Sequence, residues 1–283
     1  MQRIAYDIIA GEQGLVNLDI FSQTLNTTRF RDRDYKEDKV RWELRKLIIN
    51  ELVNMERPAN DDEIILGFGG AVPTSGVIPA KQAFVLIGLP ASGKSSIANV
   101  ISDNFNALIV DSDYAKRKLP EFSLYKWGAT VVHEESAEIV SGFPNNPNGI
   151  ESVYNYALSK NYNIVIPKIG QDAYSIVALV KSLRELGYEC HLTLVSLLKR
   201  ESTIRAIHRF YKTKRYVPLG LIFDGYGNDP CLTYHLIRNK ASELFKSFGA
   251  ISTNVPYGDP YISIDQTQGN PAELYNFDEN VLI

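Results

Sequence analysis

Several features that mark particular classes of protein are scarce in this sequence of 283 residues. The only two cysteines, Cys190 and Cys231, lack the spacing of a metal site, and so few cysteines do not indicate a disulfide scaffold. We therefore expect the protein to be located in a reducing cytoplasm. Apolar runs stay below the roughly 18 residues that a membrane span needs, and no apolar segment typical of a signal peptide follows Met1. We therefore expect neither a membrane-embedded nor a secreted protein.

An excess of basic charge is also missing. The formal net charge is −3 and the isoelectric point is about 5.9. Proteins that bind nucleic acid non-specifically need a basic surface, so nucleic acid is not an expected partner, although a local basic groove stays compatible with this composition. A length of 283 residues is enough for one large α/β domain with an appendage, and a hydrophobic fraction of 45% allows a sizeable core to be buried.

The most informative motif that is present runs from Gly88 to Ser95 and follows the apolar residues 83–87. Such a strand, glycine-rich loop and helix start form a phosphate-binding loop, in which backbone N–H groups surround a phosphate. Lys94 is expected to bridge the β- and γ-phosphates of ATP, and Ser95 to bind Mg²⁺. A plain glycine-rich turn is the alternative. The predicted ATP-binding residues are Gly88, Leu89, Pro90, Ala91, Ser92, Gly93, Lys94, Ser95 and Ser96.

From residue 81 onward, the pattern alternates between strands and helices. This pattern predicts an α/β fold with a mostly parallel sheet and helices on both faces, in which ligands bind beyond the carboxyl ends of the strands. Strands are expected at 83–87, 107–110, 163–166, 191–198 and 261–264. Helices are expected from residue 95 and over 130–140, 149–160, 175–186, 199–211 and 231–248. His191 lies in an apolar strand and is expected to be a hydrogen-bonded core residue.

Residues 1–75 differ from this core and form a predicted helical N-terminal extension. The spacing of its apolar residues predicts an amphipathic helix over 34–55, with Arg41 and Arg45 on the polar face. The helix is expected either to pack on the core or to act as a regulatory element. A glycine cluster within 64–73 indicates a flexible loop, or else a close approach of backbone to a ligand. Residues 76–265 are predicted to form the P-loop domain, and 266–283 a loose C-terminal tail.

Two carboxylates, Asp111 and Asp113, follow the predicted strand 107–110. Phosphoryl transfer needs a group that orients or deprotonates the acceptor hydroxyl, and we assign this role to Asp113. Asp111 is expected either to bind Mg²⁺ or to cap the helix that follows, since Asp is a favoured N-cap residue.

Two arginines, Arg209 and Arg215, lie on and just after the cationic helix 199–211. Guanidinium groups stabilise the charge that develops on a transferred phosphoryl group, so both are predicted catalytic residues. The other cations of this helix are expected to face solvent. His133 is a candidate for contact with the acceptor, although a solvent-exposed helix face explains it equally well.

Taken in order, these segments resemble the zeta toxin-like P-loop kinases over roughly residues 80–255. The likeness rests on the phosphate loop, on Asp111-Ser112-Asp113 followed by Leu119-Pro120-Glu121-Phe122, on the strand near 161–166, and on the segments around Arg209 and Arg215. The resemblance implies phosphorylation of UDP-N-acetylglucosamine on a sugar hydroxyl, with Lys94 and Ser95 serving ATP and Mg²⁺, Asp113 as base, and both arginines as phosphate clamp. It also implies inhibition by a helical antitoxin, so residues 1–75 are a candidate brake in cis.

The sequence departs from the family after the third strand, where the family commonly has an acidic residue followed by Gly and Thr. Here Pro167 and Lys168 replace that carboxylate with a ring and a cation, so Lys168 is a candidate acceptor-binding residue and the acceptor is expected to differ. The leading prediction is an ATP-dependent kinase acting on a small hydroxyl-bearing acceptor such as a nucleotide sugar. The alternatives are a nucleoside, antibiotic or polynucleotide-end kinase, and an ATP-binding regulatory module without turnover.

Overall fold

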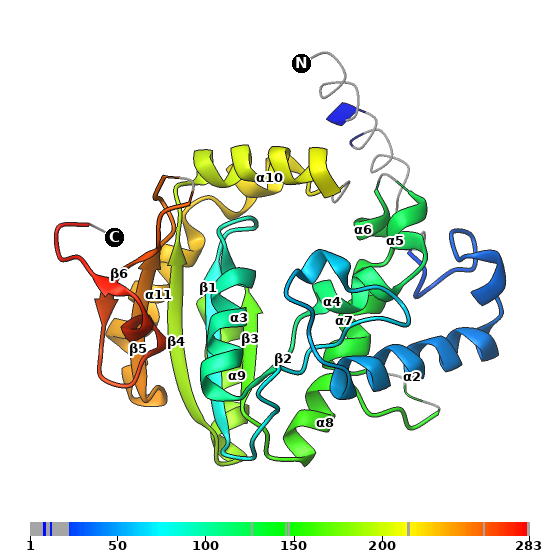
Figure 1. The fold of residues 1–283 in the computed structure, drawn as a ribbon, viewed down its shortest axis with the longest axis horizontal. Helices are drawn as coiled ribbons and strands as arrows, with labels where there is room; N and C mark the ends of the chain where they lie inside the picture. Colours follow the sequence, from blue (N-terminus) through cyan, green and yellow to red (C-terminus); the bar gives the residue numbers. More distant parts are fainter. Residues whose placement is uncertain are drawn as a thin grey trace. The chain divides into compact units, whose positions relative to one another are not determined.

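The computed structural model describes residues 8–9, 12, 23–125, 127–144, 146, 148–213, 216–256 and 258–281 (Figure 1). The chain divides into two compact units. We call residues 1–77, 110–161 and 207–218 the helical unit, and residues 78–109, 162–206 and 219–283 the sheet unit. Helix α10 (Lys199–Thr213) belongs to both, because the division falls between Ala206 and Ile207.

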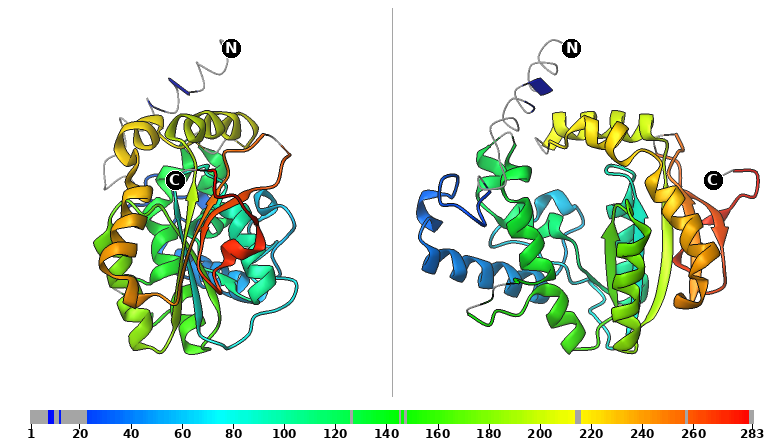
Figure 2. Two further views of the ribbon diagram at one scale, coloured as in Figure 1. Left: turned by 90° about the vertical axis from the view of Figure 1, so that its left-hand side faces the viewer. Right: turned by 180° about the vertical axis from the view of Figure 1, so that it is seen from behind.

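The sheet unit is built on strands in the order β2-β3-β1-β4-β5-β6-β7. The pairs from β2 to β5 are parallel, whereas β6 runs antiparallel to β5. Helix α3 covers one face and helices α9 and α11 cover the other (Figures 1 and 2). The strands are β1 (Gln82–Gly88), β2 (Leu108–Ile109), β3 (Ile164–Lys168), β4 (Glu189–Ser196), β5 (Ser247–Ser252), β6 (Ile262–Gln266) and β7 (Asn276–Phe277). The predicted mostly parallel sheet with helices on both faces is therefore confirmed.

The helices of the sheet unit are α3 (Lys94–Phe105), α9 (Ala173–Glu185) and α11 (Asp229–Lys240), with the π-helix η3 (Leu221–Tyr226) and the short 3-10 helices η4 (Ser242–Leu244) and η5 (Pro271–Leu274). Those of the helical unit are α2 (Asp38–Asn54), α4 (Ser112–Lys118), α5 (Glu121–Leu124), α6 (Gly128–Val131), α7 (His133–Ser141) and α8 (Val153–Ser159), with 3-10 helices η1 (Arg33–Tyr35) and η2 (Asp61–Glu63). The N-terminal extension is thus helical, as predicted.

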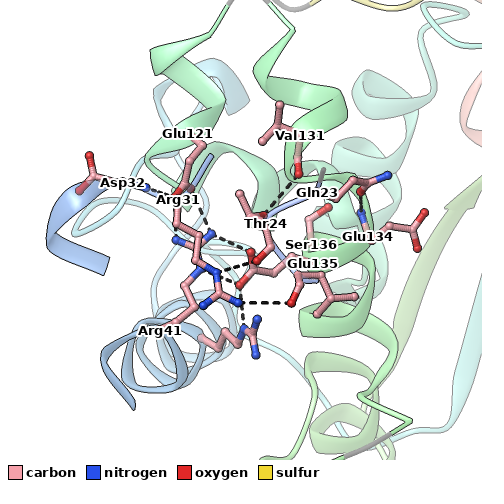
Figure 3. Close-up of polar contacts among 12 residues, drawn as sticks. Gln23, Thr24, Arg31, Asp32, Arg41, Glu121, Val131, Glu134, Glu135 and Ser136 are labelled. Atoms are coloured by element: carbon pink, nitrogen blue, oxygen red, sulfur yellow. Dashed lines mark hydrogen bonds and ion pairs between the residues drawn. The ribbon is translucent and has the colours of Figure 1, made fainter. Parts of the chain in front are cut away.

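The polar face predicted for the N-terminal helix is wrong, because Arg41 and Arg45 of α2 are buried. Arg41 Nη1 lies 2.8 Å from Glu121 Oε1, and Arg41 Nη2 lies 2.7 Å from Glu135 Oε2 (Figure 3). Arg45 Nε lies 2.7 Å from Glu135 Oε1. A buried charge is tolerated only when it is paired and hydrogen-bonded, and these carboxylates from α5 and α7 provide the pairing. Helix α2 is therefore packed into the helical unit through its charges as well as through apolar residues such as Leu44 and Ile48.

The glycine cluster within 64–73 packs against α2. A Cβ atom on Gly70 would lie 2.2 Å from the carbonyl oxygen of Met55, so only glycine allows this close approach of two backbones. Lys118 of α4 donates to Glu51 of α2 at 2.6 Å and to the carbonyl of Ile65 at 2.9 Å. The close approach at Gly70 is therefore one of backbone to backbone, and residues 64–73 also enclose the buried side chain of Lys118.

Two predicted elements differ from the observed ones near the C-terminus. The predicted helix 231–248 ends at Lys240, and residues 247–252 form strand β5 between β4 and β6. The strand was hard to recognise because it contains Gly249, where a Cβ atom would lie 2.0 Å from Asn270 Oδ1. The predicted loose tail is also wrong, since Asn270 is buried and accepts a hydrogen bond from Thr193, and η5 and β7 follow it. A single buried side chain thus fixes a segment without apolar periodicity.

His191 has the core environment predicted for it, with Nδ1 2.6 Å from Ser247 Oγ and Nε2 2.7 Å from Gln82 Oε1. Burial lowers the pKa of His191 to about 4. Because the unfolded chain takes up this proton below about pH 6.5, the free energy of unfolding should fall as the pH drops from 6.5 to 4, by about 3 kcal/mol from this residue. In His191→Gln, urea denaturation should show a loss of unfolding free energy between pH 6.5 and 4 that is smaller by about 3 kcal/mol. The same slope in wild type and variant, with exposed His235→Gln as control, would contradict this assignment.

Candidate active site

The phosphate loop of the sheet unit joins β1, which ends at Gly88, to α3, which begins at Lys94. Two residues of the loop have left-handed backbone conformations, Ala91 with φ of 60° and Gly93 with φ of 91°. Gly93 is the N-cap and supplies no capping side chain, so the first-turn N–H groups of α3 have no acceptor from that residue. A helix start of this kind favours binding of a phosphate anion.

The residues of the phosphate loop fit the space available to them. A Cβ atom on Gly88 would lie 2.6 Å from the carbonyl oxygen of Val195, so the turn requires glycine. Lys94 Nζ donates to the carbonyls of Gly88 and Leu89 at 2.5 and 2.6 Å, which folds its charge back over the loop. The buried hydroxyl of Ser92 has no hydrogen-bond partner. This donor set and the orphaned hydroxyl fit the polyphosphate of a nucleotide.

Lys168 lies at the carboxyl end of β3, in register with Ile87 of β1, which places it one residue before the phosphate loop in the neighbouring strand. Its side chain is exposed. Pro167 of β3 pairs with Leu86 of β1, but the pairing of β3 with β2 has already ended at Val165. The N–H that proline lacks is therefore missing where β3 has a neighbouring strand on one side only. The departure noted in the sequence therefore lies at the same sheet edge as the loop.

The carboxylates of the helical unit lie at the start of α4. Asp111 is the N-cap, and its Oδ1 accepts from the N–H of Asp113 at 2.9 Å. The capping role predicted as an alternative is therefore observed, and a role in metal binding stays a prediction. Asp113 Oδ1 is 3.1 Å from Lys116 Nζ on the next turn, so a cation holds one of its two oxygens.

His133 and Arg209 also belong to the helical unit. His133 begins α7 with an exposed side chain, and partial burial and the charge of Lys116 lower its pKa. Arg209 is half-buried on α10, where burial and the charge of Arg117 lower its pKa. Arg215 lies outside the described residues. In the described part of the chain, no group of three His, Cys, Asp or Glu residues is suited to hold a metal ion, and no helix is long and apolar enough to cross a membrane.

Four further residues near these groups were not predicted from the sequence. Lys116 had a recognisable signal, because it lies three residues after Asp113 on one helix face. Ser202, Arg205 and Thr253 lie around the phosphate loop but are distant from it in the sequence. Ser202 donates to the carbonyl of Pro90, and Thr253 donates to that of Ser92. No local pattern reports such contacts.

The parallel sheet and the phosphate loop between β1 and α3 define a P-loop kinase fold. The family model described as Zeta toxin matches residues 79–224, a little over half of the chain, and the chain belongs to this family. It is 26% identical over 136 residues to Toxin zeta of Streptococcus agalactiae and to Toxin zeta of Enterococcus hirae. The match spans 47% of this chain but only 45% and 46% of those relatives, a little under half of their length.

Solved structures share the fold at lower identity. The PezAT toxin–antitoxin system of Streptococcus pneumoniae matches with a TM-score of 0.50 and 16% identity, over 70% of this chain and 77% of that one. The AvrRxo1-ORF1:-ORF2 complex matches with a TM-score of 0.51 and 17% identity, over 86% and 72% of the two chains. A structure of AvrRxo1-ORF1:-ORF2 with ATP has a TM-score of 0.50 and 15% identity, over 83% and 67%.

Proposed function

We propose that this chain is an ATP-dependent kinase that transfers the γ-phosphate to a hydroxyl group of a small acceptor, such as a nucleotide sugar. The observation that carries the proposal is the phosphate loop, whose left-handed residues, uncapped helix start and folded-back Lys94 fit a polyphosphate. Membership of the zeta toxin family and the structural neighbour described with ATP support it.

Each predicted site residue has a role in this proposal. Lys94 leaves its two carbonyl contacts to neutralise the β- and γ-phosphates, and Asp113 orients and deprotonates the acceptor hydroxyl. Arg209 and Arg215 balance the charge of the transferred group. Ser95 of the sheet unit and Asp111 of the helical unit are each proposed as a Mg²⁺ ligand, and the ion would supply further charge neutralisation.

The acceptor is proposed to differ from UDP-N-acetylglucosamine, because Pro167 and Lys168 stand where the family commonly has an acidic residue. The exposed ammonium group of Lys168 favours an anionic or hydrogen-bond-accepting part of the acceptor near the sheet edge. His133, which is exposed at the start of α7, is the second proposed acceptor contact.

A mass-spectrometric screen tests this function. A metabolite extract incubated with ATP, Mg²⁺ and the full chain should gain one phosphorylated species that is missing when Lys94→Ala replaces the wild type. ATP binding by calorimetry without any phosphorylated product would support the non-catalytic alternative. Efficient phosphorylation of UDP-N-acetylglucosamine alone would contradict the proposed change of acceptor.

A protein partner is the remaining part of the proposal. One structural neighbour is described as a toxin–antitoxin system, which supports regulation of this chain by an antitoxin-like element. Within the described residues, α2 is packed through buried ion pairs, so residues 38–54 fit a structural role better than a removable brake.

A further inference from the structure

Two carbonyl groups of the phosphate loop are held by side chains from outside the motif. Ser202 Oγ on α10 donates to the carbonyl of Pro90 at 2.5 Å. Thr253 Oγ1, just after β5, donates to the carbonyl of Ser92 at 2.7 Å. Ser202 and Thr253 are fully buried, so solvent does not compete for these bonds.

The two contacts determine where the loop directs its N–H groups. In a planar trans peptide, the N–H of one residue points away from the carbonyl of the residue before it, and no cis peptide occurs in the described chain. When Pro90 and Ser92 direct their carbonyls toward Ser202 and Thr253, the N–H groups of Ala91 and Gly93 point to the opposite side. The positive φ angles of Ala91 and Gly93 belong to the same arrangement. Such a concave set of N–H groups binds anions.

Arg205 holds Thr253 in turn. Its Nη2 donates to the carbonyl of Thr253 at 2.6 Å, and its Nη1 lies 3.4 Å from Thr253 Oγ1. The N–H of Thr253 donates to the carbonyl of Ser196, at the end of β4. Because a guanidinium group has only donors, Arg205 cannot accept the single hydroxyl hydrogen of Thr253. Of the two carbonyls that can, Ser92 lies at 2.7 Å and Ser196 at 3.4 Å, so the bond to Ser92 is the shorter one.

We propose that Ser202, Arg205 and Thr253 form a loop clasp: positioning residues that set the affinity for the polyphosphate by orienting the N–H groups of Ala91 and Gly93. This inference rests on the proposed binding of ATP. It adds three residues, all in the sheet unit, that contact the loop or its support and are outside the phosphate-loop motif. Arg205 acts through Thr253 and is distinct from Arg209, which lies in the helical unit.

Calorimetric titration of the full chain with adenosine, AMP, ADP and ATP tests the clasp. Thr253→Val keeps the shape but removes the hydroxyl, and it should weaken ADP and ATP binding by about 5- to 10-fold, as expected for one lost hydrogen bond, while adenosine binding is unchanged. Ser202→Ala and Arg205→Met should act in the same direction. A structural defect alone would weaken the binding of all four ligands or of none.

Arg184→Met is the matched control, because Arg184 Nη1 also donates to a backbone carbonyl of the sheet unit, that of Glu243 at 2.9 Å. It should leave every affinity unchanged. Failure of the wild type to bind ATP would refute the proposed function itself. If the wild type binds ATP and all three clasp variants bind it with the same affinity, the clasp alone is overturned. If Thr253→Val does not fold, Ser202→Ala and Arg205→Met decide the question.

Discussion

Replacing Asp113 by Asn should lower the rate of phosphotransfer by roughly 100- to 10,000-fold, the range over which general bases contribute, and leave ATP affinity unchanged. The amide has the size of the carboxylate but cannot take the proton of the acceptor hydroxyl. The capping bond to Asp111 comes from the backbone N–H of residue 113, so it survives the substitution and α4 keeps its start.

The measurement is single-turnover transfer from labelled ATP to the acceptor found in the screen, together with calorimetric ATP titration. Asp103→Asn, on the exposed face of α3, is the matched control and should behave as wild type. Unchanged turnover in Asp113→Asn would show that another group is the base. Lost turnover together with lost ATP binding would indicate a folding defect instead.

Replacing Arg41 by Met should lower the free energy of unfolding by about 3–5 kcal/mol, because removing one partner of a buried ion pair leaves the other charge uncompensated. Burial raises the pKa of Glu135, but hydrogen bonds and charge from Arg41, together with the charge of Arg45, outweigh it and hold the pKa well below its usual range. Without Arg41, Glu121 and Glu135 lose its hydrogen bonds: α5 loses its ion pair with α2, and α7 keeps only the ion pair of Glu135 with Arg45.

Urea denaturation followed by far-UV circular dichroism measures this loss. Lys46→Met is the matched control on the same helix: its ion pair with Glu43 is exposed, so its removal should cost at most about 0.5 kcal/mol. Equal stability of Arg41→Met and wild type would show that α2 is dispensable for the helical unit.

A fragment that lacks residues 1–75 should be insoluble if α2 is structural, whereas a soluble, more active fragment would support a brake.

The parts of the fold that could be predicted are those whose signal is local. The phosphate loop is one continuous segment, and residues 83–87 of β1 are an apolar run that is buried in the sheet, so both can be found from the sequence. Arg41 and Arg45 were assigned to the wrong face because their partners, Glu121 and Glu135, lie far along the chain. The same reason hides Thr253 and Asn270, whose importance comes from buried hydrogen bonds across the sheet unit. Lys116 is the exception, since its partner is on the same helix.

The buried ion pairs of α2 also determine how the chain should respond to ionic strength. Mobile ions screen exposed charges over about 10 Å at 0.1 M salt but reach fully buried pairs poorly. Arg41, Glu121 and Glu135 have fully buried side chains, whereas Lys46 and Glu43 are exposed. Raising the salt concentration should therefore weaken contacts with a polyphosphate while the helical unit stays folded. Salt titration can thus separate electrostatic ligand binding from folding in this protein.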